Sequence, residues 1–303
     1  EQIGAAIDDK YIEELKKQVI HWDSIKEVGK DLKIVYTPLH GTGNIPARRV
    51  LKEIGFENVY VVPEQELPDG DFPTVSYPNP EAAEAFELAL ALAKEKNADL
   101  VLATDPDADR LGVYVKDTKS GEYITLTGNM SGCLLADYEI SQKKETKGLP
   151  ADGKLIKTIV TSNLADAIAE YYGVDLIEVL TGFKYIGQQI LGFETTGKGE
   201  YLFGFEESYG CLIGTHARDK DAIVATMALC EAAAYYKTKN MTLWDAMLAM
   251  YERYGYYKDG VKAVTMKGIE GLEKIQEIMN ELRTNPPKEF CGYKVESFRD
   301  YQA

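Results

Sequence analysis

The sequence is poor in cysteine and has no long apolar run. Its four cysteines in 303 residues form no CxxC pair, which excludes a disulfide framework and a cysteine zinc site. The longest apolar run, Leu88 to Ala93, is far shorter than the roughly 20 residues of a membrane span. We also expect no signal peptide. These absences predict a cytoplasmic protein with no membrane partner.

Positive charge is also scarce. Lysine and arginine number 34 against 49 aspartates and glutamates, so the net charge is -15. An acidic chain without a Lys/Arg-rich block repels polyanions, which argues against nucleic-acid partners. It also argues mildly against small anionic substrates. The hydrophobic fraction of 45% and the charged fraction of 27% are ordinary for a globular protein, and the length predicts two domains.

The two halves repeat one order of elements: strand, loop, helix, strand, helix, strand, acidic loop, strand, helix. Alternating strands and helices favour parallel neighbours, and the short acidic loops favour one antiparallel hairpin in each half. We predict an α/β fold with two similar three-layer α/β/α domains, each with a mixed sheet of about four strands. The predicted strands are 33–37, 58–62, 99–104, 111–115, 155–160, 174–180, 200–205 and 211–213.

Turn and capping signals place the boundaries. Asn79 as N-cap and Pro80 in the first turn predict a helix over 81–96. The polar stretch 141–153 is predicted to be a linker. A tail with one helix, 268–282, and a strand near 293–298 either packs on the second domain or begins a truncated further one. The predicted divisions are 1–145, 146–260 and 261–303.

The motif Asp-Pro-Asp-Ala-Asp-Arg follows the apolar strand 100–103 directly. Asp105, Asp107 and Asp109 stand at alternate positions, so their carboxylates are able to converge on one hard cation, for which Mg²⁺ is suited. An exposed acidic turn is the simpler alternative. An EF-hand loop is excluded because Arg110 and Lys116 stand where it needs glycine and glutamate. A phosphatase of the haloacid dehalogenase type, with Asp105 as nucleophile, remains a rival.

At this motif the chain resembles a known family. Asp-Pro-Asp-Ala-Asp-Arg between two strands resembles the metal-binding loop of the α-D-phosphohexomutases, the phosphoglucomutases and phosphomannomutases. Further segments resemble the family's loops in the same order along almost the whole chain, with bacterial phosphoglucomutases of the larger type most alike. These segments are Thr37–Gly43, Thr181–Lys184, Gly204–Gly210 and Arg218–Asp221.

The resemblance assigns a role to each residue of these motifs. It implies that the three aspartates hold one Mg²⁺ and that Arg110 and Lys220 act on the transferring phosphate. It also implies a set that binds the hexose phosphate, although a structural imidazole is equally expected for its histidine. That set is His40, Thr181, Gly182, Lys184, Glu206 and Ser208.

The departures from the family are equally specific. Neither the family's Ser-His-Asn-Pro motif, which carries its phosphoserine, nor its Arg-Pro-Ser-Gly-Thr-like phosphate loop is found in the sequence. We therefore expect a fragment covering the second and third domains, with 261–303 leading to the fourth, inactive without the missing first and fourth domains. Hexose 1,6-bisphosphate would serve the intact enzyme as activator and intermediate. A non-catalytic module that binds metal or sugar phosphate stays open, as does glucose, mannose or pentose preference.

Overall fold

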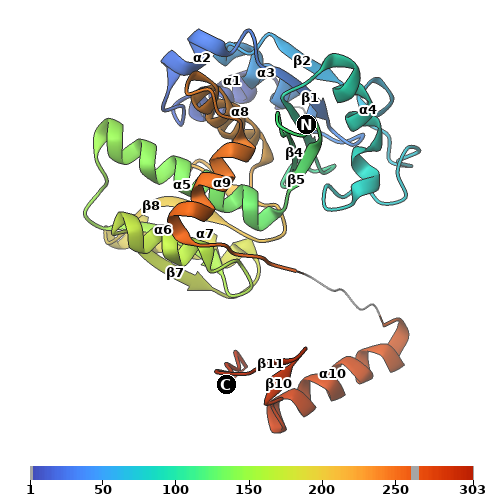
Figure 1. The fold of residues 1–303 in the computed structure, drawn as a ribbon, viewed down its shortest axis with the longest axis vertical. Coiled ribbons are helices and arrows are strands. Elements are labelled where there is room, and N and C mark those ends of the chain that lie inside the picture. Colours follow the sequence, from blue (N-terminus) through green and yellow to red (C-terminus); the bar gives the residue numbers. More distant parts are fainter. Residues whose placement is uncertain (1–2, 261–265, 303) are drawn as a thin grey trace. The chain divides into compact units, whose positions relative to one another are not determined.

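The computed structural model describes residues 3–260 and 266–302. Its contacts divide the chain into two compact units, residues 1–258 and 259–303. The larger unit holds two mixed sheets with helices on their faces (Figure 1). None of the helices in the described ranges is both long and apolar enough to cross a bilayer.

The first sheet has five strands in the order β2-β1-β3-β4-β5. β1 is parallel to β2 and β3, whereas β3, β4 and β5 pair antiparallel. The four predicted strands of this half are confirmed, and the fifth was not predicted, since β5 is short and follows a polar turn. The bounds are β1 Lys33–Thr37, β2 Asn58–Val61, β3 Leu100–Thr104, β4 Leu111–Lys116 and β5 Tyr123–Leu126.

The second sheet has four strands in the order β7-β6-β8-β9, as predicted in number and type. β6 is parallel to β7 and β8, and β8 pairs antiparallel with β9. The acidic or Glu-rich loop therefore follows the third strand of each sheet. The bounds are β6 Gly153–Thr158, β7 Asp175–Val179, β8 Glu200–Phe205 and β9 Cys211–Leu212.

The helices of the larger unit include two that the sequence pattern did not reveal, α1 and α2. Short 3₁₀ turns, η1 and η2, accompany them. The bounds are α1 Ala5–Lys16, α2 Trp22–Val28, α3 Asn44–Ile54, η1 Pro63–Gln65, η2 Ala83–Phe86, α4 Glu87–Lys96, α5 Gly128–Lys147, α6 Leu164–Tyr172, α7 Phe183–Thr196, α8 Ala222–Thr238 and α9 Leu243–Tyr254.

The predicted helix 81–96 starts too early. The Asn79 side chain accepts a hydrogen bond from the Glu81 backbone N–H at 2.9 Å, but Ala82 then returns to an extended conformation. The local bond therefore closes an Asx turn rather than capping a continuous helix. One 3₁₀ turn follows, and the α-helix itself begins at Glu87.

The predicted linker is wrong for its first half. α5 continues to Lys147, and residues 140–143 are buried within it. Their polar ends find partners, since Gln142 Oε1 lies 2.8 Å from the Nε2 of His21 and Lys143 pairs with Glu139 at 2.7 Å. Polarity along this stretch therefore marks internal contacts and not a solvated connection. The predicted division between residues 145 and 146 falls inside this helix.

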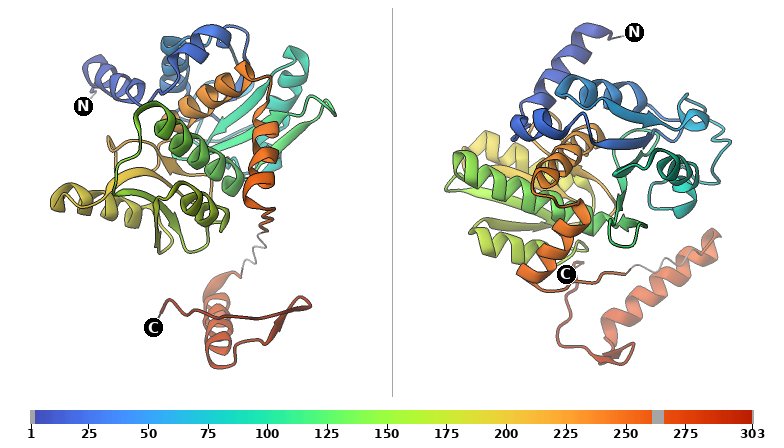
Figure 2. Two further views of the ribbon diagram at one scale, coloured as in Figure 1. Left: turned by 60° about the vertical axis from the view of Figure 1, so that its left-hand side comes forward. Right: turned by 45° about the horizontal axis from the view of Figure 1, so that its top comes forward.

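The two halves exchange helices. α8 follows the second sheet in sequence but packs on α2, α3 and β4, while α5 follows the first sheet and packs on α6 and β8. Figures 1 and 2 both show α8 beside the N-terminal helices. One apolar core accordingly runs from Ile34 and Leu102 of the first sheet to Leu155 and Phe205 of the second. The exchange fixes the orientation of one sheet relative to the other.

A buried carboxylate ties these helices together. Glu231 of α8 is fully buried and its Oε1 accepts bonds from the backbone N–H groups of Ile20 and His21, at 2.8 and 2.7 Å, where α2 begins. The hydroxyl of Tyr138 on α5 donates to the same oxygen at 2.8 Å. Burial raises the pKa of Glu231 to about 7, and the neighbouring Glu139 carboxylate adds to the rise.

We expect Glu231→Gln to stabilise the protein at high pH and to leave it unchanged near pH 5. Because the folded-state pKa is raised from 4.5, the contribution of this carboxyl is full below that value and is lost as the pH rises through about 7. Glutamine keeps the accepting oxygen without the charge. The gain in unfolding free energy at pH 8.5 should be about 2 kcal/mol relative to pH 5, measured by urea unfolding.

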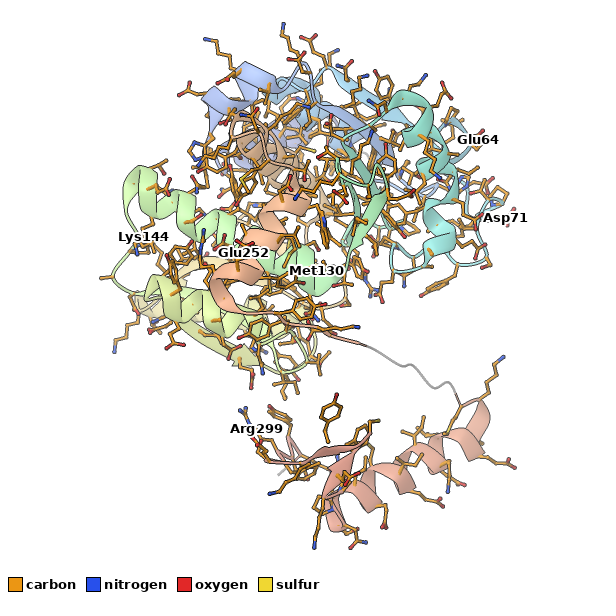
Figure 3. All side chains as sticks on the ribbon, in the orientation of Figure 1. Glu64, Asp71, Met130, Lys144, Glu252 and Arg299 are labelled. Atoms are coloured by element: carbon orange, nitrogen blue, oxygen red, sulfur yellow. The ribbon has the colours of Figure 1, made fainter. Side chains whose placement is uncertain are left out.

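Glu252→Gln, at the exposed glutamate of α9 labelled in Figure 3, is the matched control. Parallel pH profiles for wild type and Glu231→Gln would contradict this assignment.

In the smaller unit, the described residues form one helix and one hairpin. α10 spans Gly268–Thr284, and the two-residue strands β10 (Glu289–Phe290) and β11 (Tyr293–Lys294) pair antiparallel. The predicted helix is confirmed, and the predicted strand is shorter than expected. Ile269, Leu272 and other apolar side chains of this helix are exposed, so the unit buries little of its own apolar surface.

Candidate metal and sugar-phosphate site

The acidic motif forms the loop between β3 and β4. Ala108 adopts a left-handed conformation, φ 58°, which turns the chain so that alternate side chains share one side. Asp105, Asp107 and Asp109 each contribute one carboxylate oxygen to a group in which all three oxygens lie within 4.8 Å of one another. Asp105 Oδ1 accepts bonds from the backbone N–H groups of Asp109 and Arg110, both at 2.9 Å. The loop therefore holds three converging carboxylates in a fixed turn.

The electrostatics of this cluster fit a dication. Burial raises the pKa of Asp105 to about 7; the bond from the Arg110 backbone opposes this rise, and the Asp109 and Asp107 charges reinforce it. Asp109 Oδ1 is buried and has no hydrogen-bond partner among the residues that the structure describes. A donor set made only of carboxylate oxygens suits a hard cation such as Mg²⁺. The residues present therefore fit the metal that the motif predicts.

The acidic loop lies directly against the loop that follows β8. Arg110 and Gly210 form an antiparallel β-bridge, and the Leu111 backbone N–H donates to the Tyr209 carbonyl at 3.0 Å. We call residues 206–210 the sugar loop, after the resemblance described above. The Ala222 backbone N–H also donates to the Ala108 carbonyl at 3.0 Å. The two motifs are about 100 residues apart in sequence, so backbone pairing between the sheets brings them together.

Both predicted cations lie beside the carboxylates of the acidic loop. Arg110 belongs to the loop itself, and Lys220 comes from the second half of the chain. Lys220 Nζ lies 2.9 Å from Asp109 Oδ2. Burial lowers the pKa of Lys220, but the bonds and charges of Asp109 and Asp219 outweigh this and raise it. Arg110 lies 3.2 Å from Glu81 and 3.6 Å from Asp109 Oδ1. Lys220 therefore keeps its charge beside the cluster.

Glu206 begins the sugar loop in a buried position. Its Oε1 accepts a bond from the Gly182 backbone N–H at 3.0 Å, which joins the predicted 181–184 loop to the sugar loop. Burial raises the pKa of Glu206, and the Lys220 charge opposes the rise. Ser208 is half-buried beside it, and Tyr209 closes the turn in a left-handed conformation, φ 69°. Backbone strain of this kind is typical of binding turns.

The start of α5 packs directly against the backbone of the sugar loop. A Cβ atom at Gly128, two residues before the Met130 labelled in Figure 3, would overlap the carbonyl oxygen of Glu207. We expect Gly128→Ala to lower the unfolding free energy by about 2–3 kcal/mol, because backbone rather than a flexible side chain fills the space. Gly192→Ala on α7, where a Cβ meets open space, should be neutral or slightly stabilising. Equal unfolding midpoints for the two variants in a urea titration would contradict the close approach.

The remaining predicted residues, Thr181, Lys184 and His40, make no hydrogen bond or ion pair with the acidic loop in the part of the chain that the structure describes. Thr181 and Lys184 are exposed, and Lys184 Nζ stands 5.0 Å from the centroid of the Tyr185 ring. His40 is buried with its Nδ1 3.3 Å from the Leu67 carbonyl and its Nε2 2.8 Å from the Thr74 hydroxyl. Both ring nitrogens are thus occupied within the first half. His40 serves the packing of its loop in this structure.

The structure adds contacts that the motifs did not indicate. Thr158 and Thr161 direct their hydroxyls at the Glu207 carboxylate, at 3.0 and 3.3 Å. Thr42 donates through its backbone N–H and its hydroxyl to the Pro106 carbonyl, at 2.8 and 3.0 Å. Thr42 lies within the predicted Thr37–Gly43 segment, but no local sequence signal distinguishes Thr158 and Thr161 from ordinary threonines, because their partner Glu207 lies 49 and 46 residues away.

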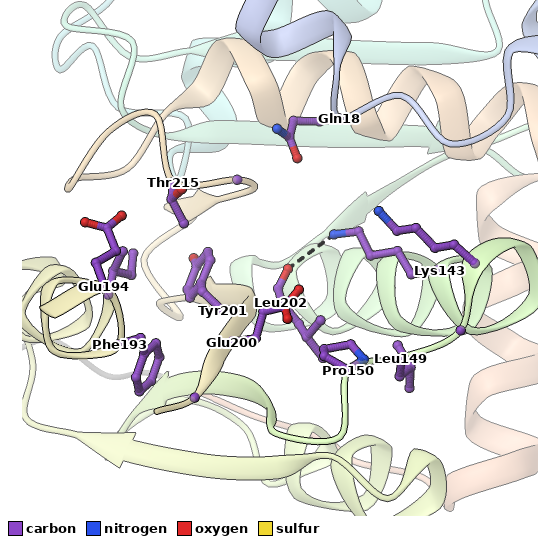
Figure 4. Close-up of a pocket in the computed structure, with 15 residues that line it drawn as sticks. Gln18, Lys143, Leu149, Pro150, Phe193, Glu194, Glu200, Tyr201, Leu202 and Thr215 are labelled. Carbon is purple, nitrogen blue, oxygen red and sulfur yellow. Dashed lines mark hydrogen bonds between the residues drawn. The ribbon is translucent and has the colours of Figure 1, made fainter. Parts of the chain in front are cut away.

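A cavity of about 700 Å³ lies elsewhere (Figure 4). It is lined by Glu200 to Leu202 at the amino end of β8, whereas Glu206 follows the carboxyl end of the same strand. Lys143 at its wall donates to the Leu202 carbonyl at 3.4 Å and pairs with buried Glu139. This cavity and the converging carboxylates are therefore two different places.

Family models match both halves of the chain. The model described as phosphoglucomutase/phosphomannomutase, alpha/beta/alpha domain II, matches residues 9–121, and that of domain III matches residues 127–254. The chain belongs to this family, the α-D-phosphohexomutase superfamily, and covers its domains II and III. This membership excludes the rival assignment to the haloacid dehalogenase phosphatases.

Similar proteins agree with the family. Phosphoglucomutase of Staphylococcus aureus is 38% identical over 271 residues, 89% of this chain and 48% of that protein. The chain thus spans about half the length of the curated relatives it matches. A Thermus thermophilus structure assigned as a phosphomannomutase superposes with a TM-score of 0.66 at 23% identity, covering 82% of this chain and 51% of the other. Aspergillus fumigatus N-acetylphosphoglucosamine mutase, in complex with GlcNAc-6P and magnesium, gives 0.50 at 15%, covering 77% and 52%.

Proposed function

We propose that this chain is the metal-binding and sugar-binding half of a phosphohexomutase. The intact enzyme would interconvert hexose 1-phosphates and hexose 6-phosphates through a phosphoserine and a bisphosphorylated sugar. The observation that carries the proposal is the junction of the two loops, where Arg110 pairs with Gly210 and Lys220 bonds Asp109. The magnesium and sugar phosphate bound by the Aspergillus enzyme support the same chemistry.

Asp105, Asp107 and Asp109 would hold Mg²⁺. When bound there, the ion supplies electrostatic stabilisation to a phosphoryl group in transfer. The chain's own residues position the reactants. Lys220, already fixed by Asp109, presents a retained positive charge to phosphate oxygens. Arg110 provides a second cation at the edge of the same loop.

The sugar loop would bind the hexose through its hydroxyl groups. Glu206 offers a carboxylate that is already oriented by the Gly182 backbone N–H, and Ser208 offers a hydroxyl beside it. Orientation of two groups by fixed backbone lowers the entropic cost of binding. The exposed Lys184 and Thr181 stand next to Gly182 and would contact the sugar phosphate from the other side.

The chain by itself should bind hexose phosphate without turning it over. The Ser-His-Asn-Pro motif and the distal phosphate loop of the family are not in its 303 residues, so a phosphoryl donor and a second phosphate clamp would have to come from other domains. Calorimetric or NMR titration of the chain with glucose 6-phosphate and Mg²⁺ tests the proposal. Binding that depends on Glu206 and Ser208 supports it, and the absence of any binding contradicts it.

A further inference from the structure

One lysine of the second sheet is completely buried. Lys157, on β6, has 0% of its surface exposed, although lysine is almost never fully buried unless it is paired. Its Nζ lies 3.4 Å from the Thr161 carbonyl, 3.5 Å from the Ser162 carbonyl and 3.0 Å from Asn163 Oδ1, and it also donates to Asp166. The ammonium group therefore ties together the loop that joins β6 to α6.

The acceptors around Lys157 explain why a cation is kept there. The carbonyls of Thr161 and Ser162 stand just before α6 begins at Leu164. Buried carbonyls without donors cost free energy, and an unpaired buried cation costs more. Asp166, in the first turn of α6, supplies the balancing charge, and Glu178 Oε2 lies 3.9 Å away on β7.

The loop that Lys157 ties down contacts the sugar loop. The hydroxyls of Thr158 and Thr161, both buried, donate to Glu207 Oε2 at 3.0 and 3.3 Å. The Ser162 backbone N–H donates to Asn129 Oδ1 at 2.9 Å, next to the Gly128 on which Glu207 rests. Glu207 is thus held on one side by the β6–α6 loop and on the other by the start of α5.

We propose that Lys157 is a positioning residue for the sugar loop. Its ammonium fixes residues 161–163. Thr161 in that loop, together with Thr158 next to Lys157 on β6, then fixes Glu207, and Glu207 sets the direction of its neighbours Glu206 and Ser208. Lys157 itself touches no substrate. This inference rests on the proposed function for the identity of the ligand, a hexose phosphate. The ordering of the sugar loop can be measured without any ligand.

The test compares Lys157→Met, Lys157→Arg and Thr161→Val with the control Lys154→Met. Lys154 lies on the same strand and also forms ion pairs, with Asp152 and Asp175. Lys154→Met therefore removes an ion-paired lysine from β6 without touching residues 161–163. Two readouts are taken from the full 303-residue chain. The first is amide hydrogen exchange of peptides that cover residues 204–210, and the second is the affinity for glucose 6-phosphate at saturating Mg²⁺.

Lys157→Met should raise exchange in 204–210 about tenfold and weaken glucose 6-phosphate binding about tenfold, with Mg²⁺ affinity unchanged. Lys157→Arg, which keeps the donors, should recover part of both effects, and Lys154→Met should change neither. If Lys157→Met exchanges and binds like Lys154→Met, the inference is wrong even though the chain binds sugar phosphate.

Two further outcomes are also decisive. If the wild-type chain binds no glucose 6-phosphate, the proposed function fails, and the exchange data alone still support or contradict the positioning role. If Lys157→Met does not fold, Thr161→Val takes its place, because it removes one hydroxyl from Glu207 and leaves the ammonium in place. Unchanged exchange of 204–210 in a folded Thr161→Val chain would overturn the inference.

Discussion

Asp107→Asn should weaken Mg²⁺ binding roughly a hundredfold while leaving the metal-free protein as stable as the wild type or slightly more so. Asp107 is the exposed member of the acidic cluster. Asp105, in contrast, accepts two backbone bonds that hold the loop. Removing the Asp107 charge therefore removes a proposed ligand and leaves the turn intact. It also relieves repulsion between the carboxylates in the absence of metal.

The measurement is isothermal titration with Mg²⁺, paired with thermal unfolding in EDTA. Asp71→Asn is the matched control, since Asp71 is an exposed carboxylate in the loop before η2 (Figure 3). A Mg²⁺ affinity for Asp107→Asn equal to that of Asp71→Asn would show that the cluster is not the metal site. A large loss of thermal stability in EDTA would show that the side chain has a structural role instead.

Ser208→Ala should weaken glucose 6-phosphate binding about tenfold, and Glu206→Gln should weaken it more, with Mg²⁺ affinity retained in both. Ser208 contributes one hydroxyl from a half-buried position. Glu206 contributes a buried carboxylate that already accepts the Gly182 N–H, and its replacement removes a charge-assisted acceptor. Because backbone contacts join the sugar loop to the acidic loop, these side chains can change without moving the aspartates.

Ser120→Ala serves as the control for this pair. Ser120 lies in the exposed turn between β4 and β5 and donates to Asp117 at 2.7 Å. NMR titration with glucose 6-phosphate at saturating Mg²⁺ gives the affinities, and unfolding midpoints check the fold. If Ser208→Ala and Glu206→Gln both bind like Ser120→Ala, the loop 206–210 does not contact the sugar, and the proposed function loses its substrate site.

Much of the fold could be read from short-range pattern. The eight predicted strands are confirmed because strands such as β3 are continuous apolar runs, buried on both faces, that end at a polar loop. The metal candidates were found for the same reason, since three aspartates alternate immediately after that strand. β5 was not predicted because it has only four residues after a polar turn. α1 and α2 were not predicted because their sequences are largely polar and they pack on elements farther along the chain, α3 and α8.

Local signals failed where distant partners decided the outcome. The polarity of residues 141–147 favours a linker, yet Gln142 and Lys143 are buried. Gln142 lies against the distant His21, and Lys143 donates to the distant Leu202 carbonyl. For His40 the sequence leaves a substrate ligand and a structural imidazole open, and the contacts of its ring with Leu67 and Thr74 favour the structural imidazole. Thr158 and Lys157 belong to no motif, and their contacts reach partners that the sequence pattern does not place beside them.

By itself, the sequence determined the α/β class, the two sheets, the family and the chemical identity of the loops. Those follow from periodicity and from residue types at fixed spacing, which act within a few residues. Only the tertiary structure decided that α5 and α8 are exchanged, that Arg110 pairs with Gly210 and that Lys220 reaches Asp109. These contacts join residues about 100 positions apart, where burial and pairing geometry, rather than local preference, select the partner.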